Sequence, residues 1–536
     1  MGVRIFSLPL EIHALVFLDL ELVDLVYLGW TCRAFREIVS QRVVWENALR
    51  MVCARDGLFT PSYPFDEMDL CDLKRAALHP FQWNQRMLSI DPGEQGCLTP
   101  HREIPLPRDP RVNPQVEFLD AYILPGGRYV VGSSPNFITL WDLGPIHHSL
   151  EYPPRILDTI YDAADRYRIS FPTRPSPHGT NCFRICAFFY SIEMNLRCLR
   201  VYEVGPLPRS TSFRLLGQLD TFGMAMSWLV GDCVVLETVG AVKWHLVWNV
   251  TRNLVTSPFE LVGRTFPTLG VSLYLGTVYR LFPYSHLYLQ WAVEGCSLLG
   301  LQRKELDSEE GDFITNLSAW RIPKLDPIED KISLPLWHFS TMERIEPDIQ
   351  VDFDQGEVAS LRPDYGSSIP PMAFRSSSVG TSIFHLFLHS PDAPTSKIGL
   401  CTVAIVNEGI DESGNSGETT VRLLSHDLLR KPYLISRSRC RHYSVMGDYI
   451  TSVIETTTPV AASNTRTKYV SETNLVHSRI EADKGSLGGS CRLATVPVKQ
   501  GNRVTSLCTA SGRMAHIGKS NSDRVSTVFI SYFLAP

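Results

Sequence analysis

The chain has 536 residues, of which 44% are hydrophobic and 20% are charged, and its formal net charge is −5. These proportions are ordinary for a folded protein. The length allows roughly three or four domains, or one large repeat domain with an appendage. The slightly acidic balance gives no electrostatic reason to expect nucleic acid or an anionic membrane surface as a partner.

The thirteen cysteines are scattered, and none form a Cys-x-x-Cys pair. Only Cys182 and Cys186 lie close together, in a strand-like stretch. A tetrahedral zinc site needs ligands clustered at short spacing, so we expect no metal and no other cofactor. The odd, dispersed set indicates reduced thiols, which places the protein in the cytoplasm, the nucleus or both.

The first apolar stretch, residues 7–35, does not have the pattern of a targeting segment. A signal peptide needs an unbroken apolar core of about 7–15 residues, and a membrane span needs about 20. Polar side chains interrupt this stretch at Glu11, His13, Asp19, Glu21 and Asp24. We therefore expect neither, and no later stretch of the chain qualifies as a span.

Residues 7–49 instead predict three short helices. Pro9 suits a first helical turn, and Ile12, Leu15 and Val16 share one helical face. Asp24 is a candidate cap for a second helix from Leu25 to about residue 32. A unit this small is marginal as an independent domain, so we expect it to lean on another surface.

The segment 49–115 is predicted to be a spacer that is first helical and then extended. Residues 66–78 have a helical pattern, whereas residues 103–115 contain four prolines. Proline disfavours the helical conformation in the residue before it, so the second part must be extended or turning.

From residue 116 the pattern becomes that of an all-β fold, with short apolar runs between Gly, Pro, Asn and Ser clusters. The clearest unit is 118–144, with strands at 129–132 and 137–143. Its last strand has an aromatic residue followed by an acidic or amide residue, as do 199–205 and 245–251; weaker candidates are 316–322 and 526–533. We interpret these positions as blade-closing, at Trp141, Asp142, Tyr202 and Trp248.

The aromatics of these units are 61 and 46 residues apart. A propeller blade takes about 40–45 residues, so the second spacing fits and the first needs an insertion. Residues 116–536 are thus predicted to form a diverged β-propeller of unspecified blade number. Polar stretches at about 305–312, 407–420 and 461–490 are expected to be long loops.

Two glycine-rich stretches resemble nucleotide or catalytic motifs without meeting their requirements. Residues 512–520 have five residues between the glycines, where a phosphate-binding loop has four. Residues 485–490 lack the Gly-x-Ser-x-Gly spacing of a nucleophile elbow. We expect a strand and turn at the first, a loop at the second, and no catalytic residues.

The N-terminal block resembles an F-box, whose landmarks occur in register without a gap. They are Leu8, Pro9, Glu11, Ile12, Val16, Phe17, Leu20, Asp24, Leu25, Cys32, Arg33, Phe35, Ile38 and Trp45. The departures are the pair Glu21-Leu22, where a proline is common, and the pair Gly29-Trp30 inside the second helix. The resemblance assigns residues 1–48 to the F-box.

This resemblance implies docking on the Skp-type adaptor of an SCF-type cullin–RING ubiquitin ligase. The implied adaptor-binding residues are Leu8, Pro9, Ile12, Leu15, Val16, Leu20, Leu25 and Cys32. The implied structural residues are Phe17, Asp24, Phe35, Ile38 and Trp45. For any one of the apolar residues, a place in the internal core is an equally open alternative.

The β region resembles diverged WD-type repeats, and the whole is similar to fungal F-box proteins with a propeller receptor domain. Such a protein would be a non-catalytic receptor that holds an unknown target protein for ubiquitination. Two alternatives stay open: a scaffold that uses the adaptor without a ligase, and a propeller enzyme. The only dense basic run, 436–441, leaves phosphate recognition undecided and is expected to be a solvated loop or edge.

Overall fold

The computed structural model describes the backbone of most of the chain. The described residues are 9, 12–13, 16–17, 20–91, 95–145, 152–161, 166–176, 179–191, 196–220, 224–230, 232–238, 245–256, 259–261, 286–292, 295–305, 313–321, 325–327, 343–345, 349–352, 362–363, 381–389, 398–407, 419–429, 438–446, 449–460, 468–481, 486–498, 502–519 and 526–534.

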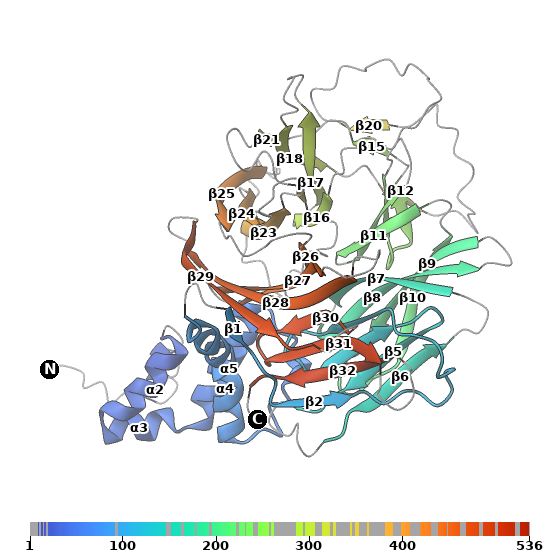
Figure 1. The fold of residues 1–536 in the computed structure, drawn as a ribbon. Helices are drawn as coiled ribbons and strands as arrows, with labels where there is room; N and C mark the ends of the chain where they lie inside the picture. Colours follow the sequence, from blue (N-terminus) through green and yellow to red (C-terminus); the bar gives the residue numbers. More distant parts are fainter. Residues whose placement is uncertain are drawn as a thin grey trace.

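Helices occupy the N-terminal part of the chain and lie together at one side of the molecule (Figure 1). They are α2 (Leu22–Thr31), α3 (Arg33–Val39), α4 (Arg42–Asp56), the short 3-10 helix η2 (Thr60–Ser62) and α5 (Leu70–Leu88). Residues 12–13 and 16–17 are helical as well. The predicted helical character of this part is confirmed.

The start of the second helix differs from the prediction. α2 begins at Leu22 with Glu21 in the N-cap position, and that cap makes no side-chain hydrogen bond. Asp24 is therefore inside the first turn and does not cap the helix. Its negative charge still favours this position, because the N-terminal end of a helix carries a partial positive charge.

The helix expected at 66–78 begins later and runs further. Asp69 and Asp72 form a reciprocal capping box, with Asp69 Oδ1 accepting from the Asp72 amide at 2.8 Å. α5 then passes through Pro80, which removes one backbone hydrogen bond. Trp83 and Met87 beyond the proline are fully buried, and this burial compensates for the break in the hydrogen-bond ladder.

Within the described residues, seven sheets follow the helices. The first contains β3 (Asp120–Ile123), β4 (Tyr129–Ser133), β5 (Phe137–Asp142) and β6 (Arg155–Tyr161); the second contains β7 (Arg166–Ser176), β8 (Gly179–Ser191), β9 (Leu196–Val204) and β10 (Phe213–Asp220). The third contains β11 (Met224–Val230), β12 (Cys233–Thr238), β13 (His245–Asn249) and β14 (Leu254–Thr256), extended by β15 (Phe259–Leu261), β19 (Leu325–Pro327) and β20 (Glu343–Ile345).

The remaining sheets repeat this plan. The fourth has β16 (His286–Ala292), β17 (Gly295–Glu305), β18 (Phe313–Arg321) and β21 (Ile349–Asp352); the fifth has β22 (Arg362–Pro363), β23 (Thr381–His389), β24 (Ile398–Asn407) and β25 (Thr419–Leu429). The sixth has β26 (Ser438–Met446), β27 (Tyr449–Val460), β28 (Lys468–Glu481), β29 (Ser486–Val496) and β1 (Gln95–Cys97); the seventh has β30 (Arg503–Cys508), β31 (Arg513–Lys519), β32 (Ser526–Tyr532) and β2 (Arg102–Pro105).

The plan is β-propeller-like. Each sheet is built on antiparallel strands that are neighbours in sequence, as in a blade. Successive sheets are in contact in chain order, through pairs such as β7 with β11 and β26 with β30. The seventh sheet also contacts the first, through β30 and β3.

The segment 49–115 does more than set a spacing between two parts. β1 pairs in parallel with β29, and β2 pairs antiparallel with β32, so both strands complete sheets made from the C-terminal end of the chain. The proline-rich stretch is extended at β2, as expected. These two strands fasten the helices to the β region.

One hydrophobic core runs from the helices into the β region. Trp45 and Leu73 of the helices belong to the same buried cluster as Trp141 of the first sheet and Ile530 of the seventh. A second cluster packs Trp83 of α5 against the sixth and seventh sheets. The small helical unit therefore leans on the sheets, as its size predicted.

The strands predicted at 129–132, 137–143, 199–205, 245–251, 316–322 and 526–533 are confirmed, with ends that shift by a few residues. Residues 513–519 form strand β31, as expected instead of a phosphate-binding loop. Residues 438–441 of the basic run begin β26, which is an edge strand as expected. Most of the polar stretches 305–312 and 407–420 lies outside the described residues.

The loop prediction for 461–490 is wrong. Residues 468–481 form β28, which pairs with strands on both sides, and residues 486–490 of the second glycine-rich stretch begin β29. Sequence polarity misled the prediction because several polar side chains here are buried and hydrogen-bonded. His477 contacts the hydroxyl of Thr451 at 2.9 Å, and Asn474 accepts from Thr495 at 3.0 Å.

Candidate protein-docking surface

The N-terminal helices have a defined internal core. Trp45 on α4 is 1% exposed, and its Nε1 donates to the carbonyl of Val39 at 2.7 Å. Leu25 on α2 and Phe17 before it are also buried in the cluster that contains Trp45. This core fixes the relative positions of the three helices, and with them the surface that they present.

The predicted structural residues are not equivalent in the structure. Phe17 and Trp45 are buried, whereas Phe35 and Ile38 on α3 are half-buried and pack against the same core. Asp24 is exposed on α2. The structure thus brings four of the five together and leaves the fifth facing water.

The predicted adaptor-binding residues divide between surface and interior. Ile12 and Val16 are 40% and 48% exposed, and Pro9 is exposed as well. Leu20 is half-buried against the internal core and Leu25 is buried within it, while Cys32 is half-buried. Leu8 and Leu15 lie outside the described residues.

Sequence reasoning missed an aromatic pair on α2. Tyr27 and Trp30 are 56% and 69% exposed, and their ring centroids lie 5.6 Å apart in an edge-on arrangement. Val43 at the start of α4 is 41% exposed. The residue spacing carried a signal, since both aromatics lie on the face of α2 opposite Leu25, but Trp30 was read only as a departure from the family pattern.

Exposed apolar residues are concentrated on these helices. Ten large hydrophobic side chains are exposed among those described, and five of them, Ile12, Val16, Tyr27, Trp30 and Val43, fall in residues 12–43. Single exposed apolar residues need no explanation, whereas a local concentration is typical of interaction surfaces. We call these five residues the apolar helix surface.

Charged side chains on α3 and α4 form ion pairs with one another near this surface. Arg33 and Glu37 pair at 2.9 Å on α3, and Glu46 of α4 lies between Arg42 and Arg50. Such exposed pairs contribute little stability.

The predicted blade-closing residues occupy equivalent places in three consecutive sheets. Trp141, Tyr202 and Trp248 lie on β5, β9 and β13, each the third strand of its sheet in chain order, and all three are buried. They fall in three separate hydrophobic clusters, so each aromatic anchors its own sheet. They do not come together into one site.

The polar residue after each aromatic is also buried. Asp142 accepts from Arg128 at 2.9 and 3.0 Å, and Glu203 accepts from Arg184 at 3.0 Å. The corresponding Asn249 in the third sheet accepts from the backbone amide of Arg252 at 2.9 Å. The repeat recognised in the sequence is therefore a repeated structural device in which a buried polar group ties the end of the third strand to its neighbours.

No group of three or more His, Cys, Asp or Glu side chains could hold a metal ion within the described part of the chain. Burial raises the pKa of the Cys53 thiol to about 12, with a smaller contribution from Asp56. That thiol is protonated at neutral pH and unreactive. A search of the described helices finds none that is long and apolar enough to span a membrane.

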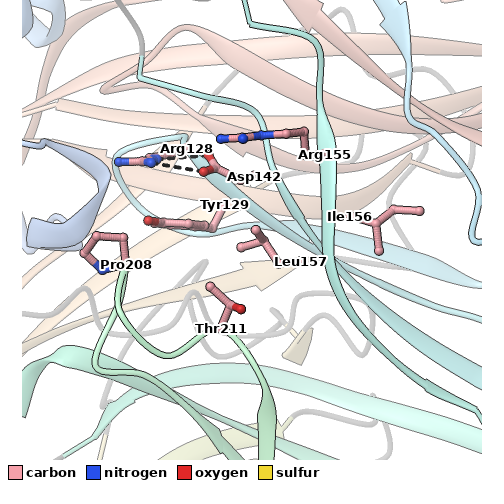
Figure 2. A pocket seen from close by; sticks show the side chains of 8 residues that line it. All are labelled: Arg128, Tyr129, Asp142, Arg155, Ile156, Leu157, Pro208 and Thr211. Carbon is pink, nitrogen blue, oxygen red and sulfur yellow. Dashed lines mark hydrogen bonds and ion pairs between the residues drawn. The ribbon is translucent and has the colours of Figure 1, made fainter.

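A cleft lies at one edge of the first two sheets (Figure 2). It has a volume of about 270 Å³ and is lined by Arg128, Tyr129, Asp142, Arg155, Ile156, Leu157, Pro208 and Thr211. Sequence reasoning identified Asp142 as a structural residue but gave no signal for a cleft, because its lining joins strands of the first sheet to Pro208 and Thr211 of the loop between β9 and β10.

No protein-family model matches the sequence, and no curated protein matches it. Solved structures with a similar fold include the β-propeller of Vanderwaltozyma polyspora Nup133, with 8% identity, a TM-score of 0.35, and coverage of 80% of this chain and 97% of that one. The WD40 domain of SCAP from fission yeast has 8% identity, a TM-score of 0.29, and coverage of 78% and 82%. At such scores the likeness carries no argument, and the β-propeller-like description rests on the sheet order of this chain.

Proposed function

We propose that this protein is a non-catalytic substrate receptor of an SCF-type cullin–RING ubiquitin ligase. The N-terminal helices would act as an F-box that binds a Skp-type adaptor and, through it, a cullin. The β region would be a closed seven-bladed propeller that holds a target protein. The observation that carries the proposal is the apolar helix surface, which coincides with the stretch that resembles an F-box.

Burial of this surface on a partner would supply the binding energy. A large aliphatic side chain contributes about 1.5–3 kcal/mol when it passes from full exposure to full burial. Ile12 and Val16 are close to half exposed, so each would contribute a fraction of that amount. Tyr27 and Trp30 add larger areas, and aromatic residues often dominate protein interfaces.

The rigid connection between helices and sheets supports the same proposal. A receptor must hold its target at a fixed distance from the ligase, so adaptor-binding and target-binding parts cannot move freely. Here the helices share buried clusters with the first, sixth and seventh sheets, and β1 and β2 complete two of the sheets. The shared clusters and strands therefore hold the helices in a fixed position relative to the β region.

The proposal is tested by reconstitution from purified proteins. The full chain is mixed with a Skp-type adaptor alone, and with that adaptor in complex with a cullin, and the mixtures are separated by size-exclusion chromatography. We expect the chain to co-elute with the adaptor and with the complete complex. Binding to the adaptor without retention of the cullin would favour the scaffold alternative, and the absence of adaptor binding would reject both.

A further inference from the structure

The cleft between the first two sheets has a polar end and an apolar wall. Figure 2 shows Arg128, Asp142 and Arg155 gathered at the polar end, while Leu157 and Pro208 lie along the wall. Arg155 on β6 lies directly opposite Asp142 on β5, because the two residues are register partners in the antiparallel pairing of these strands. The folding of the first sheet therefore places both arginines beside one carboxylate.

The charges at this end do not balance. Asp142 is fully engaged, because it accepts two hydrogen bonds from Arg128 and one from the amide of Gly144 at 2.8 Å. Arg155 forms no ion pair with the side chains that the structure describes, and its guanidinium contacts only the ring of Tyr152, at 5.9 Å. The lining thus keeps one positive charge in excess.

A second, independent feature of the cleft is an unpaired hydroxyl. Tyr129 is 1% exposed, lines the cleft, and its hydroxyl has no hydrogen-bond partner within the described part of the chain. Burial raises the pKa of this phenol above its ordinary value, so the group stays a hydrogen-bond donor. A buried donor without a partner is costly, and a ligand that accepts from it would remove this penalty.

We propose that the cleft binds an acidic side chain, Asp or Glu, from a segment of a partner protein in which an apolar residue comes next. The guanidinium of Arg155 forms a planar fork that matches a carboxylate, and the Tyr129 hydroxyl supplies a further donor. The neighbouring apolar residue would pack against Leu157 and Pro208. The carboxylate is a single negative charge, as the single unmatched positive charge of the lining requires.

Two properties of the cleft distinguish this ligand from others. A phosphate dianion would carry two negative charges where the lining offers one unmatched positive charge, and the carboxylate of Asp142 nearby would repel it. The volume of about 270 Å³ is at the lower limit for small-molecule sites, which run from about 300 to 1,000 Å³, and suits one or two side chains of a peptide. Its role as a target site rests on the proposed receptor function, but the binding itself does not.

The test uses the full chain and three immobilised 12-residue peptides with both ends blocked. All have a Gly-Ser background, and the central pair is Glu-Leu, Gln-Leu or phosphoserine-Leu. Biolayer interferometry at up to 100 μM protein should detect the Glu-Leu peptide and show at least tenfold weaker binding of Gln-Leu. No binding of Glu-Leu, equal binding of Glu-Leu and Gln-Leu, or tighter binding of the phosphoserine peptide would overturn the proposal.

Variants of the protein separate the site from general charge effects. Arg155→Gln should weaken Glu-Leu binding at least tenfold and leave Gln-Leu binding unchanged. The matched control Arg252→Gln removes an exposed arginine from the turn after β13 and should change neither. If both variants lost Glu-Leu binding to a similar extent, the net charge of the protein alone would be responsible.

The hydroxyl is tested by Tyr129→Phe with two measurements. Glu-Leu binding should weaken severalfold, while the melting temperature of the free protein should stay the same or rise, because an unpaired buried hydroxyl is lost. A lower melting temperature would show that the hydroxyl has a partner inside the protein and would overturn its assignment to the ligand. Because no adaptor is present, these results can fail independently of the proposed ligase function.

Discussion

The buried ion pair of the first sheet offers a direct test of the blade device. Asp142 and Arg128 are 6% and 10% exposed at the side chain and are joined by two hydrogen bonds of 2.9 and 3.0 Å. Asp142→Asn keeps the shape of the side chain but leaves the Arg128 charge buried without a counter-ion. Removing one partner of a buried pair costs about 3–5 kcal/mol.

A chemically matched control is available on α3. Arg33 and Glu37 also pair at 2.9 Å, but their side chains are 92% and 64% exposed. Exposed pairs contribute about 0–1 kcal/mol, so Glu37→Gln should lower the free energy of unfolding by less than about 1 kcal/mol. The bond lengths are alike, and the pairs differ in burial and in the number of hydrogen bonds, which is two for Arg128 and Asp142 and one for Arg33 and Glu37.

The assay is urea-induced unfolding of the full chain, followed by tryptophan fluorescence, with Asp142→Asn and Glu37→Gln measured against the unchanged protein. We expect a clear fall of the midpoint for Asp142→Asn and almost none for Glu37→Gln. Equal midpoint shifts for the two variants, or no shift for Asp142→Asn, would refute the view that this buried pair holds the third strand in place.

Three further predictions concern packing and pH. In thermal unfolding, Gly132→Ala should lower stability by about 1–3 kcal/mol, because the added Cβ would lie 2.5 Å from the ring of Trp141. Gly29→Ala should instead raise stability by about 0.5–1 kcal/mol, because the nearest atom to the added Cβ would be 3.7 Å away. Burial lowers the pKa of His477 from 6.5 to about 4, so on acidification the unfolded chain binds a proton at this residue before the folded chain does. The free energy of unfolding should therefore fall by about 3 kcal/mol between pH 7 and pH 4, progressively below pH 6.5. A free energy of unfolding that stays constant over this range, or a pH dependence that His477→Gln leaves unchanged, would contradict this. Trp83→Ala should lower the free energy of unfolding by about 3–5 kcal/mol, because Trp83 of α5 is fully buried against the sheets. The melting temperature, followed by circular dichroism, should fall equally for the helices and the sheets. Separate melting of the helices would disprove the shared core.

Periodicity predicted the helices and most strands because their apolar residues face buried hydrophobic clusters. Trp141, Tyr202 and Trp248 could be recognised as equivalent from the residue that follows each of them, and the structure places all three on the third strand of a sheet. The sequence-based prediction failed at β28, where polar side chains such as His477 are buried and hydrogen-bonded inside the sheet. Composition alone cannot distinguish such a strand from a solvated loop.

The long-range strand pairings also could not be predicted from the sequence. The pairing of β1 with β29 and of β2 with β32 joins residues about 400 apart, and no local pattern indicates either partner. For the docking surface, spacing identified Ile12 and Val16 but could not separate them from Leu25, which is buried. That separation depends on how the helices pack, which is a tertiary property.

The most direct test of the central claim is the affinity of the full chain for a purified Skp-type adaptor, measured by isothermal titration calorimetry. The double change Ile12→Asp, Val16→Asp places two charges on the apolar helix surface. The control Tyr161→Asp, Leu215→Asp does the same at side chains of the β region that are 44% and 49% exposed. All three proteins should have the same circular dichroism spectrum.

The account predicts measurable binding by the unchanged protein, at least about hundredfold weaker binding after the helix change, which corresponds to about 2.7 kcal/mol, and no effect of the control change. Full-strength binding by the Ile12→Asp, Val16→Asp protein, or no binding by the unchanged one, would contradict the proposed F-box function.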